Sequence, residues 1–237
     1  MYFIVVKYQV KPEFAEVFPD HTAAFTAATR AESGNLWFDW YRSIEDPNEY
    51  VLVEAFADEM GDGPIGVTVP AVVTHGITRS AANIHETWID AEAEKIFEDV
   101  LGRDIYLVND ADAAGVAEVH YGAAKGHEGL VVLTTLGTGI GTAIIQNGVL
   151  VPNSELGHIE VDGKDAESEA SAAVRERLDL TWPAYIVRLQ RYYETLEALL
   201  WLDVLVVGGG ISKKSDKFLP KLKLRTPIVP ATLRNAA

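Results

Sequence analysis

The sequence changes character at Gly61-Asp62-Gly63-Pro64, and this break constrains the fold more than any other feature. Glycine and proline in such a cluster end regular structure. Before the break, apolar alternation and aromatic residues predict strands at 2–10, 36–43 and 50–56, and helical spacing predicts a helix at 13–31. The first sixty residues therefore have a β-α-β-β pattern, in which the last two strands form a hairpin.

After the break, aromatic residues become fewer, glycine and alanine become more frequent, and strands alternate with helices. The pattern predicts strands at 65–69, 104–108, 130–136, 140–145 and 204–207, and helices at 91–101, 111–123, 166–178, 183–201 and 213–218. Alternation of this kind is typical of a layered α/β sheet. We therefore divide the chain into residues 1–60 and 61–237.

Composition excludes several classes of protein. The chain of 237 residues is 48% hydrophobic, which is enough to bury a core. It has no cysteine, which excludes disulfides and thiolate zinc sites and fits a cytoplasmic protein. A net charge of −15 argues against general binding to nucleic acid or to anionic membranes. The longest apolar run, 129–145, is too short and too rich in glycine to span a bilayer, so we expect a soluble protein.

Positive charge is nevertheless concentrated near the end of the chain. Residues 201–237 carry seven Lys or Arg against two acids, and Lys213, Lys214 and Lys217 lie close together. Such a run is either a solvated helix face or a binding surface for a polyanion. The pattern alone leaves both interpretations open.

Two glycine-rich turns follow apolar segments. Gly137-Thr138-Gly139 joins two predicted strands, where backbone N–H groups can approach a phosphate closely. A dinucleotide-binding turn would lead into a helix instead. Gly208-Gly209-Gly210 does lead from a buried strand into a helix, which suits a phosphate at a helix N-terminus. The alternatives are an ordinary glycine-rich hairpin and a tight turn from strand to helix.

Asn109 and Asp110 lie where a predicted strand ends and a helix begins. Ligands collect at this edge of open α/β sheets. Asp110 is therefore either the cap of the helix or a general base for a hydroxyl nucleophile. We expect Asp112 to serve the first helical turn.

Glu155, His158 and Glu160 form a polar loop before Asp162-Gly163. Sugar hydroxyls both donate and accept hydrogen bonds, so recognition of a polyol needs a set of polar side chains of this kind. A histidine with two carboxylates is also a possible metal site, although no further ligand spacing supports that alternative.

Taken together and in this order, the motifs resemble those of the polyphosphate glucokinases of the ROK family (repressors, open reading frames, kinases). The resemblance begins near Pro64 and covers about three-quarters of the chain. The matching stretches are IGVTVPAVV, RSAANI, VNDADAAG, YGAAKG, TTLGTGIG, GVLVPNSELGHIEVDG, LQRYYETLEALLWLDVLVVGGGIS, DKFLPKL and RTPIVPATLRN. The resemblance implies an α/β actin-like ATPase fold with RNase-H-like lobes, and phosphoryl transfer from polyphosphate or ATP to the 6-hydroxyl of glucose.

The resemblance also implies roles for individual residues. Asp110 would be the catalytic base. Glucose would be held by Asn83, Asn109, Glu155, His158 and Glu167. The phosphate donor would lie along Gly137, Thr138, Gly139, Gly208, Gly209 and Gly210, with Lys213, Lys214 and Lys217 as a polyanion track. Mg²⁺ is implied, because phosphoryl transfer depends on charge neutralisation, whereas zinc is not, because the cysteine-rich zinc loop of most ROK proteins is missing.

Residues 1–60 depart from that family. They contain no Asp-x-Gly-Gly-Thr-like phosphate turn. Instead, FIVVKYQVKPEFAEVF, FTAATRAESGNLWFDWYRS and DPNEYVLVEAF resemble the antibiotic-biosynthesis-type (quinol) monooxygenases, which are cofactorless oxygenases with a ferredoxin-like fold. The second helix of that fold, with its histidine motif, is missing. We therefore expect a truncated ROK kinase fold that follows a partial ferredoxin-like segment.

Three functions follow from these observations. The first is a glucokinase-like phosphotransferase that retains glucose binding better than turnover, because groups that position charge are missing. The second is a quinol-monooxygenase-like module. The third is a non-catalytic protein that binds sugar or self-associates. We expect a homodimer, because the exposed edge of a partial sheet favours strand pairing.

Overall fold

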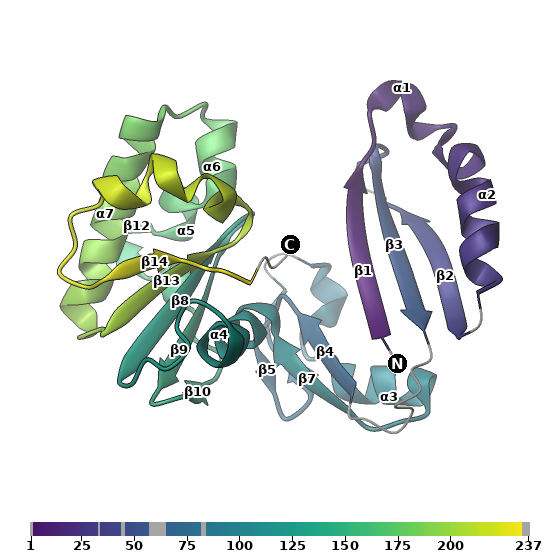
Figure 1. The fold of residues 1–237 in the computed structure, drawn as a ribbon, viewed down its shortest axis with the longest axis horizontal. Helices are drawn as coiled ribbons and strands as arrows, with labels where there is room; N and C mark the ends of the chain where they lie inside the picture. Colours follow the sequence, from purple (N-terminus) through teal and green to yellow (C-terminus); the bar gives the residue numbers. More distant parts are fainter. Residues whose placement is uncertain (1, 33, 44–45, 57–64, 82–83, 234–237) are drawn as a thin grey trace. The chain divides into compact units, whose positions relative to one another are not determined.

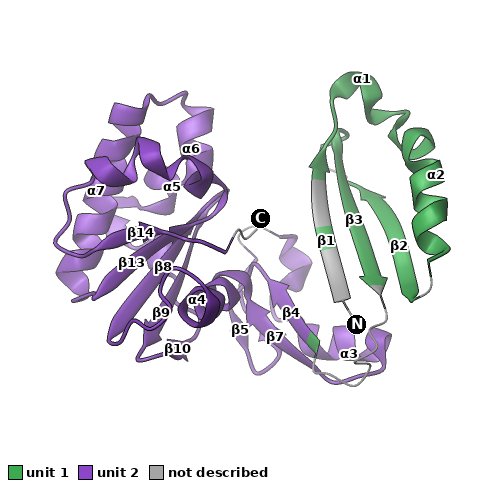
Figure 2. Ribbon diagram, in the orientation of Figure 1, with its two compact units in different colours: residues 1–65 green, residues 66–237 purple. Residues whose placement is uncertain are grey.

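The computed structural model describes residues 2–32, 34–43, 46–56, 65–81 and 84–233. The chain forms two compact units, residues 1–65 and residues 66–237 (Figure 2). Both units are mixed α/β structures, so the predicted fold class is confirmed. No helix in the described ranges is long and apolar enough to cross a lipid bilayer.

The first unit is a three-stranded antiparallel sheet in the order β1-β3-β2 (Figure 1). Its elements are β1 (Tyr2–Gln9), α1 (Pro12–Ala15), α2 (Phe18–Arg30), β2 (Asn35–Arg42) and β3 (Glu49–Phe56). The predicted β-α-β-β pattern is present, but the single helix expected at 13–31 is two helices. Pro19 explains the interruption, because its ring clashes with the carbonyl four residues earlier and it has no N–H to donate.

Aromatic side chains hold α2 against this sheet. The Phe18 ring meets the Trp40 ring edge-on, with centroids 5.1 Å apart, and Phe25 meets Phe38 in the same way at 5.5 Å. The Trp40 indole Nε1 donates to the Thr26 hydroxyl at 3.0 Å, so its polar group stays satisfied. Edge-on aromatic pairs add to the free energy of simple burial.

A five-stranded mixed sheet forms the centre of the second unit, in the order β10-β9-β8-β13-β14. Its strands are β8 (Leu130–Leu136), β9 (Ile140–Gln146), β10 (Val149–Val151), β13 (Val204–Gly208) and β14 (Ile228–Pro230). The first three are antiparallel neighbours, whereas β13 lies parallel to both β8 and β14. The predicted strands at 130–136, 140–145 and 204–207 are therefore confirmed.

Helices cover both faces of this sheet (Figure 1). Leu205 and Val207 pack with α7 (Trp182–Leu199) on one face. Val204 and Val206 pack with α4 (Asp110–Tyr121) on the other. Burial on both faces explains why β13 is an unbroken apolar run rather than an alternating one.

The remaining part of this unit precedes the sheet in the sequence. Here β4 (Ile65–Val69) pairs with β7 (Ile105–Asn109), and β5 (Val73–Thr74) pairs with β6 (Ile77–Thr78). In the sequence, the 3₁₀ helix η1 (Glu86–Trp88) and the helix α3 (Ala93–Leu101) lie between β6 and β7. The predictions of β4, β7, α3 and α4 are confirmed to within two residues at each boundary.

Two predicted helices differ from the structure. The helix expected at 166–178 is α5 (Glu167–Ala170) followed by α6 (Ala172–Arg177), because Ser171 is extended and its side chain caps α6 at the Val174 N–H. The segment expected as a helix at 213–218 belongs to the 3₁₀ helix η3 (Gly210–Lys217). Only Ile211 is buried in η3, so no apolar face stabilises an α-helix there. Short elements complete the unit: η2 (Leu156–His158), β11 (Glu160–Val161), β12 (Lys164–Asp165) and η4 (Leu219–Lys221).

A buried carboxylate connects α4 to the segment after β14. Glu118 is 1% exposed and accepts from the backbone N–H of Ala123 at 2.6 Å and of Leu233 at 2.7 Å. The Thr232 N–H also donates to it, at 3.2 Å. One side chain therefore satisfies three backbone donors from two distant segments.

Replacing Glu118 should destabilise the protein strongly. Glu118→Ala leaves these N–H groups without an acceptor, and we expect it to lower the free energy of unfolding by about 2–4 kcal/mol. Urea unfolding followed by circular dichroism measures the change. Glu128→Ala, at an exposed position after α4, serves as the control. Equal unfolding midpoints for the two variants would contradict this role.

Candidate functional site

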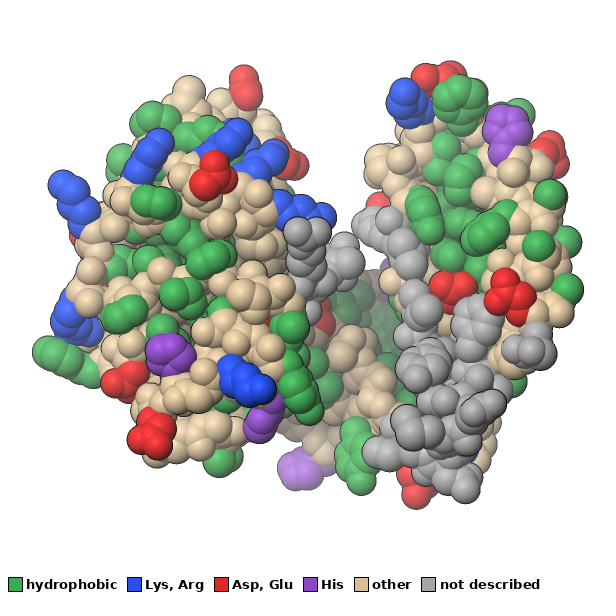
Figure 3. Space-filling view, in the orientation of Figure 1, with side chains coloured by type: hydrophobic (Ala, Val, Ile, Leu, Met, Phe, Trp, Pro, Cys, Tyr) green, Lys and Arg blue, Asp and Glu red, His purple; other side chains and the backbone are tan. Residues whose placement is uncertain are grey.

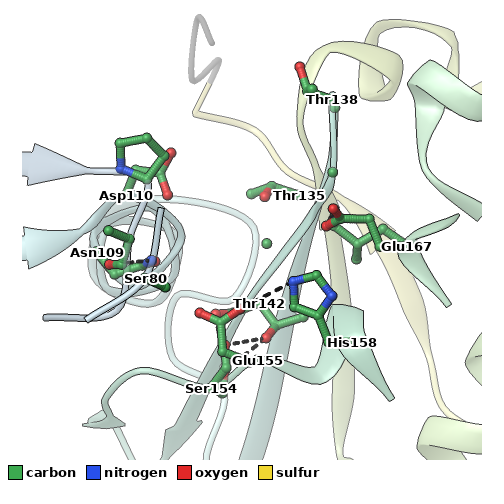
Figure 4. A pocket seen from close by; sticks show the side chains of 16 residues that line it. Ser80, Asn109, Asp110, Thr135, Thr138, Thr142, Ser154, Glu155, His158 and Glu167 are labelled. Carbon is green, nitrogen blue, oxygen red and sulfur yellow. Dashed lines mark hydrogen bonds and ion pairs between the residues drawn. The ribbon is translucent and has the colours of Figure 1, made fainter. Parts of the chain in front are cut away.

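A cavity of about 210 Å³ lies in the second unit, where β7 meets α4 and the β8–β9 hairpin approaches (Figure 4). Segments that are far apart in the sequence meet there. Its polar side chains are those of Ser80, Asn109, Asp110, Thr135, Thr138, Thr142, Ser154, Glu155, His158 and Glu167. Most of the predicted site residues are therefore brought together at one place, while Asn83 lies outside the described residues.

Asn109, and not Asp110, caps α4. The Asn109 Oδ1 accepts from the N–H of Ala111 at 2.8 Å and of Asp112 at 3.1 Å. Its Nδ2 donates to the Ala71 carbonyl at 3.0 Å, which ties a lining segment to the start of the helix. Asn109 takes this role because its backbone is extended and directly precedes the helix, whereas Asp110 is already the first helical residue. The capping role considered for Asp110 is thereby taken by its neighbour.

Asp110 is the first residue of α4 and is exposed on the cavity side. Its Oδ1 accepts from the Ala111 N–H at 2.8 Å. Displacement of water by the surrounding protein raises the pKa of the carboxyl, and the backbone hydrogen bonds oppose this rise. A carboxylate with a raised pKa accepts a proton more readily, which suits a general base.

His158 is held between two carboxylates at the end of η2. Its Nδ1 lies 2.9 Å from the Asp165 Oδ2, and its Nε2 lies 3.9 Å from the Glu155 Oε2. The hydrogen bond with Asp165 raises the pKa of His158, and nearby carboxylates add to the rise. Desolvation raises the pKa of Glu155, which His158 opposes. Sequence analysis missed Asp165, because only the β11–β12 hairpin brings it back to His158.

Glu167 holds the glycine-rich hairpin through a hydrogen bond to one residue and close contact with another. Its Oε2 accepts from the Ile140 N–H at 2.7 Å, and a Cβ on Gly139 would lie 2.2 Å from that oxygen. Gly139 is therefore needed for this close approach. The Gly137 N–H donates to the Gly139 carbonyl at 3.0 Å, so this one amide is already engaged within the turn.

A second cavity, of about 230 Å³, lies on the other side of the hairpin. It shares Gly137 and Thr138 with the first cavity, so the two spaces meet at the hairpin. Arg175 and Lys214 also line it, and α6 is held there by a hydrogen bond of 3.1 Å from the Ala173 N–H to the Gly137 carbonyl. Arg175 and Lys214 bring positive charge to the second cavity, where Glu176 supplies one carboxylate, whereas three carboxylates and His158 line the first.

Arg175 is a residue that sequence analysis missed. Its guanidinium carbon lies 4.1 Å from the centre of the Trp182 ring, and its Nε is buried with no hydrogen-bond partner among the described residues. A buried N–H without an acceptor is unfavourable by itself, so the position suits an anionic ligand that accepts from this Nε. Arg175 lies inside the helix predicted at 166–178, and nothing in that sequence pattern indicates an anion-binding role.

The other predicted phosphate and polyanion residues are distributed unevenly. Gly210 lines the second cavity, whereas Gly208 is buried in β13. Gly209 has a φ of +79°, and its Cβ would lie 2.4 Å from the Leu136 carbonyl oxygen. Lys213 and Lys217 are exposed, and the Lys217 Nζ lies 5.8 Å from the Trp182 ring centre. Figure 3 shows Lys and Arg side chains over the upper part of this unit.

Asp112 does not serve the helix start in the way that the sequence suggested. Its Oδ2 accepts from the Asn153 N–H at 2.7 Å, across to the loop that carries Glu155. Within the ranges described, no group of three or more His, Cys, Asp or Glu side chains is placed to hold a metal ion. The metal alternative for the His158 loop therefore gains no support from the structure.

His158 should make stability depend on pH. Because the folded pKa of His158 is raised, its contribution is complete below the unfolded value of about 6.5 and is lost as pH rises through the folded value. The lowered pKa of Asp165 keeps the partner ionised in that range. We expect the melting temperature of His158→Gln to fall furthest below that of the unaltered protein between about pH 5 and 6.5. In an Asp165→Asn background this pH dependence should become smaller, because only Glu155 and Glu167 then favour the charged imidazole, and an unchanged pH dependence there would contradict the assignment.

Comparison with known proteins identifies two families along the chain. The ROK family model matches residues 42–176, and the model for antibiotic biosynthesis monooxygenase matches residues 1–60. The predicted resemblance to both families is thus confirmed. The ferredoxin-like segment and the ROK region overlap at residues 42–60 in these matches.

Individual relatives agree with the ROK match. The polyphosphate glucokinase of Mycobacterium tuberculosis (strain H37Rv) is 51% identical over 176 residues, covering 74% of this chain and 66% of that protein. The polyphosphate glucokinase of Mycobacterium leprae is 46% identical over 175 residues, covering 73% of this chain and 54% of that protein. This chain therefore spans less than two thirds of the length of either relative.

A solved structure extends the likeness to the fold. The crystal structure of the inorganic polyphosphate/ATP-glucomannokinase from Arthrobacter sp. strain KM matches with a TM-score of 0.73 at 44% identity. The match covers 96% of this chain and 81% of that one. With the ROK model matching more than half of its residues, the chain belongs to the ROK family.

Proposed function

We propose that this chain is a glucokinase-like phosphotransferase, which moves a phosphoryl group from polyphosphate or ATP to the 6-hydroxyl of glucose. One observation carries the proposal: two cavities of different charge meet at Gly137 and Thr138. The carboxylates of Asp110, Glu155 and Glu167 line the first, whereas Arg175 and Lys214 outnumber the one carboxylate of the second, Glu176. The named activities of the Mycobacterium and Arthrobacter relatives support the same assignment.

The first cavity would hold the sugar. Glu155 and Glu167 offer carboxylate oxygens as acceptors, and His158 offers ring nitrogens beside them. Asn109 lines the same cavity. The sugar-binding role of Asn83, which lies outside the described residues, stays a prediction. Asp110 would accept the proton of the 6-hydroxyl as the sugar oxygen attacks the terminal phosphorus. The proton passes to a carboxylate oxygen while the bond from phosphorus to the leaving phosphate breaks.

The second cavity would hold the phosphates that are not transferred. Arg175 and Lys214 supply positive charge there, and Lys213 and Lys217 extend it over the adjoining surface. The hairpin at Gly137-Thr138-Gly139 and the turn at Gly208-Gly209-Gly210 let the donor approach the backbone closely. The terminal phosphate would then lie over the hairpin, next to the sugar.

The residues fit Mg²⁺ that arrives with the donor. Mg²⁺ in phosphoryl-transfer sites is held largely by water and by substrate phosphates rather than by a protein cage. The Thr138 hydroxyl lines the cavity and would be the protein oxygen for such an ion, which leaves the Asp110 carboxylate for the sugar proton. Such an ion neutralises charge that develops on the phosphate oxygens.

We propose that glucose binding exceeds turnover in this chain. Residues 1–64 contain no Asp-x-Gly-Gly-Thr-like turn, whereas Asn109, Glu155, His158 and Glu167 line the first cavity. Loss of groups that position charge costs phosphoryl transfer several kcal/mol of barrier, and each ~1.4 kcal/mol is a tenfold loss of rate. Turnover should therefore be slow while sugar binding persists.

Asp110→Asn tests the catalytic base. Because an amide cannot accept the proton, we expect the rate of glucose 6-phosphate formation to fall by about 10³-fold with either donor. Glucose should still raise the melting temperature of the variant, since the groups that hold the sugar remain. A coupled assay with Mg²⁺ and polyphosphate or ATP measures the rate, with Asp104→Asn as an exposed control. Turnover by Asp110→Asn equal to that of the unaltered chain would refute the role.

Arg175→Ala tests the donor side. Because a cation that contacts the phosphate chain is removed, we expect the KM for the donor to rise about tenfold while the KM for glucose stays the same. The matched control is Arg177→Ala, which removes an exposed arginine from the same helix. A change in the glucose KM alone would place Arg175 on the wrong side of the hairpin.

A further inference from the structure

Two segments that line the acceptor cavity come from distant parts of the sequence. Pro70 and Ala71 precede β5, whereas Ser154 and Glu155 follow β10. About eighty residues separate the two segments in the sequence, so the chain that links them does not fix the distance between them. Their relative positions must come from side chains that join the two segments.

Asn153 makes that connection to β5. Its Nδ2 donates to the Val73 carbonyl at 2.7 Å, and its Oδ1 accepts from the Val73 N–H at 2.8 Å. The side-chain amide thus pairs with both backbone groups of one residue, as a neighbouring strand would. Asn153 has a φ of +61°, a conformation that asparagine tolerates better than most residues.

Asp112 joins Asn153 to α4. Its Oδ2 accepts from the Asn153 N–H at 2.7 Å, and the Asp112 N–H donates to the Asn109 Oδ1. The side chain is 1% exposed, and its Oδ1 has no partner among the residues described. A buried carboxylate in such a position is unfavourable, so a stability role alone does not account for it.

These contacts form a closed frame beside the acceptor cavity, behind the residues that line it. Asn109 holds Ala71, Asn153 holds Val73, and Asp112 holds Asn153. Figure 4 shows Asn109 and Asp110 on one side of the cavity and Glu155 and His158 on the other. The frame therefore links the end that carries the base to the loop that carries the sugar ligands.

We propose that Asp112 and Asn153 are positioning residues for the acceptor, which set where the sugar lies relative to Asp110. The inference rests on the proposed function and goes beyond it, because neither residue lines the cavity. They act indirectly, by fixing the positions of Glu155 and of the segment that contains Ala71. A displacement of about 1 Å at a reacting group can lower a rate about 10²-fold, so a frame of this kind affects catalysis without touching substrate.

Asn153→Gly is the decisive variant, because glycine keeps the left-handed backbone and removes only the amide. We expect the KM for glucose to rise about tenfold and kcat to fall, while the KM for the donor stays the same. Asn147→Gly is the matched control. Asn147 also has a positive φ and lies in the turn after β9, outside the cavity lining. Its Oδ1 accepts from the Gly129 N–H.

Asp112 provides a rescue by a conservative change. Asp112→Asn keeps an oxygen that accepts from the Asn153 N–H, so glucose kinetics should remain close to those of the unaltered chain. Asp112→Ala removes that acceptor and should reproduce the kinetics of Asn153→Gly. Equal kinetics for Asp112→Ala and Asp112→Asn, with both proteins folded, would overturn the proposal.

Hydrogen exchange separates this inference from the proposed function. In Asn153→Gly the Val73 amide loses its acceptor and should exchange faster, whereas Asn147→Gly should leave it unchanged. If the unaltered chain neither binds glucose nor forms glucose 6-phosphate, the proposed function fails and the acceptor role fails with it. Unchanged exchange at Val73 and unchanged glucose KM in Asn153→Gly would overturn the frame even in an active enzyme.

Discussion

The parallel pairing of β13 with β8 is the interaction on which the site depends. The register places Gly208 beside Thr135, so the turn that follows β13 emerges next to the β8–β9 hairpin. Gly209 then packs against the Leu136 backbone at a distance that no side chain would allow. Without this pairing, which is buried between α4 and α7, Gly210 and Lys214 would not lie beside the hairpin that both cavities share.

Charge is divided across this shared hairpin. Asp110, Glu155 and Glu167 line the first cavity, where the proposed sugar would offer hydroxyl donors to carboxylates. Arg175 and Lys214 line the other cavity together with Glu176, and the proposed phosphate chain would meet their positive charge there. In a chain with a net charge of −15, these two cations are a local exception.

Much of the fold could be predicted, because periodicity reports burial directly. β8, β9 and β13 lie where apolar β-branched runs indicated, and α4 begins where strand β7 ends. Predictions failed where a single polar residue overrode the pattern, as Ser171 did by extending the backbone between α5 and α6. For the site, Asp110, Glu155 and His158 could be selected from their motifs. Asp165 and Arg175 could not be selected in this way, because their contacts with His158 and Trp182 become visible only in the folded chain.

The sequence by itself determined the two-part division of the chain, the order of strands and helices in each part, and the residue types available for chemistry. It did so because glycine and proline breaks and apolar spacing act locally. Only the tertiary structure decided that Asn109 ties the start of α4 to Ala71, and that Asp112 accepts from the Asn153 N–H. It also decided that the Arg175 guanidinium lies over the Trp182 ring. The contacts of Asn109 with Ala71 and of Asp112 with Asn153 join residues that are adjacent in space and not in sequence, so no local pattern encodes them.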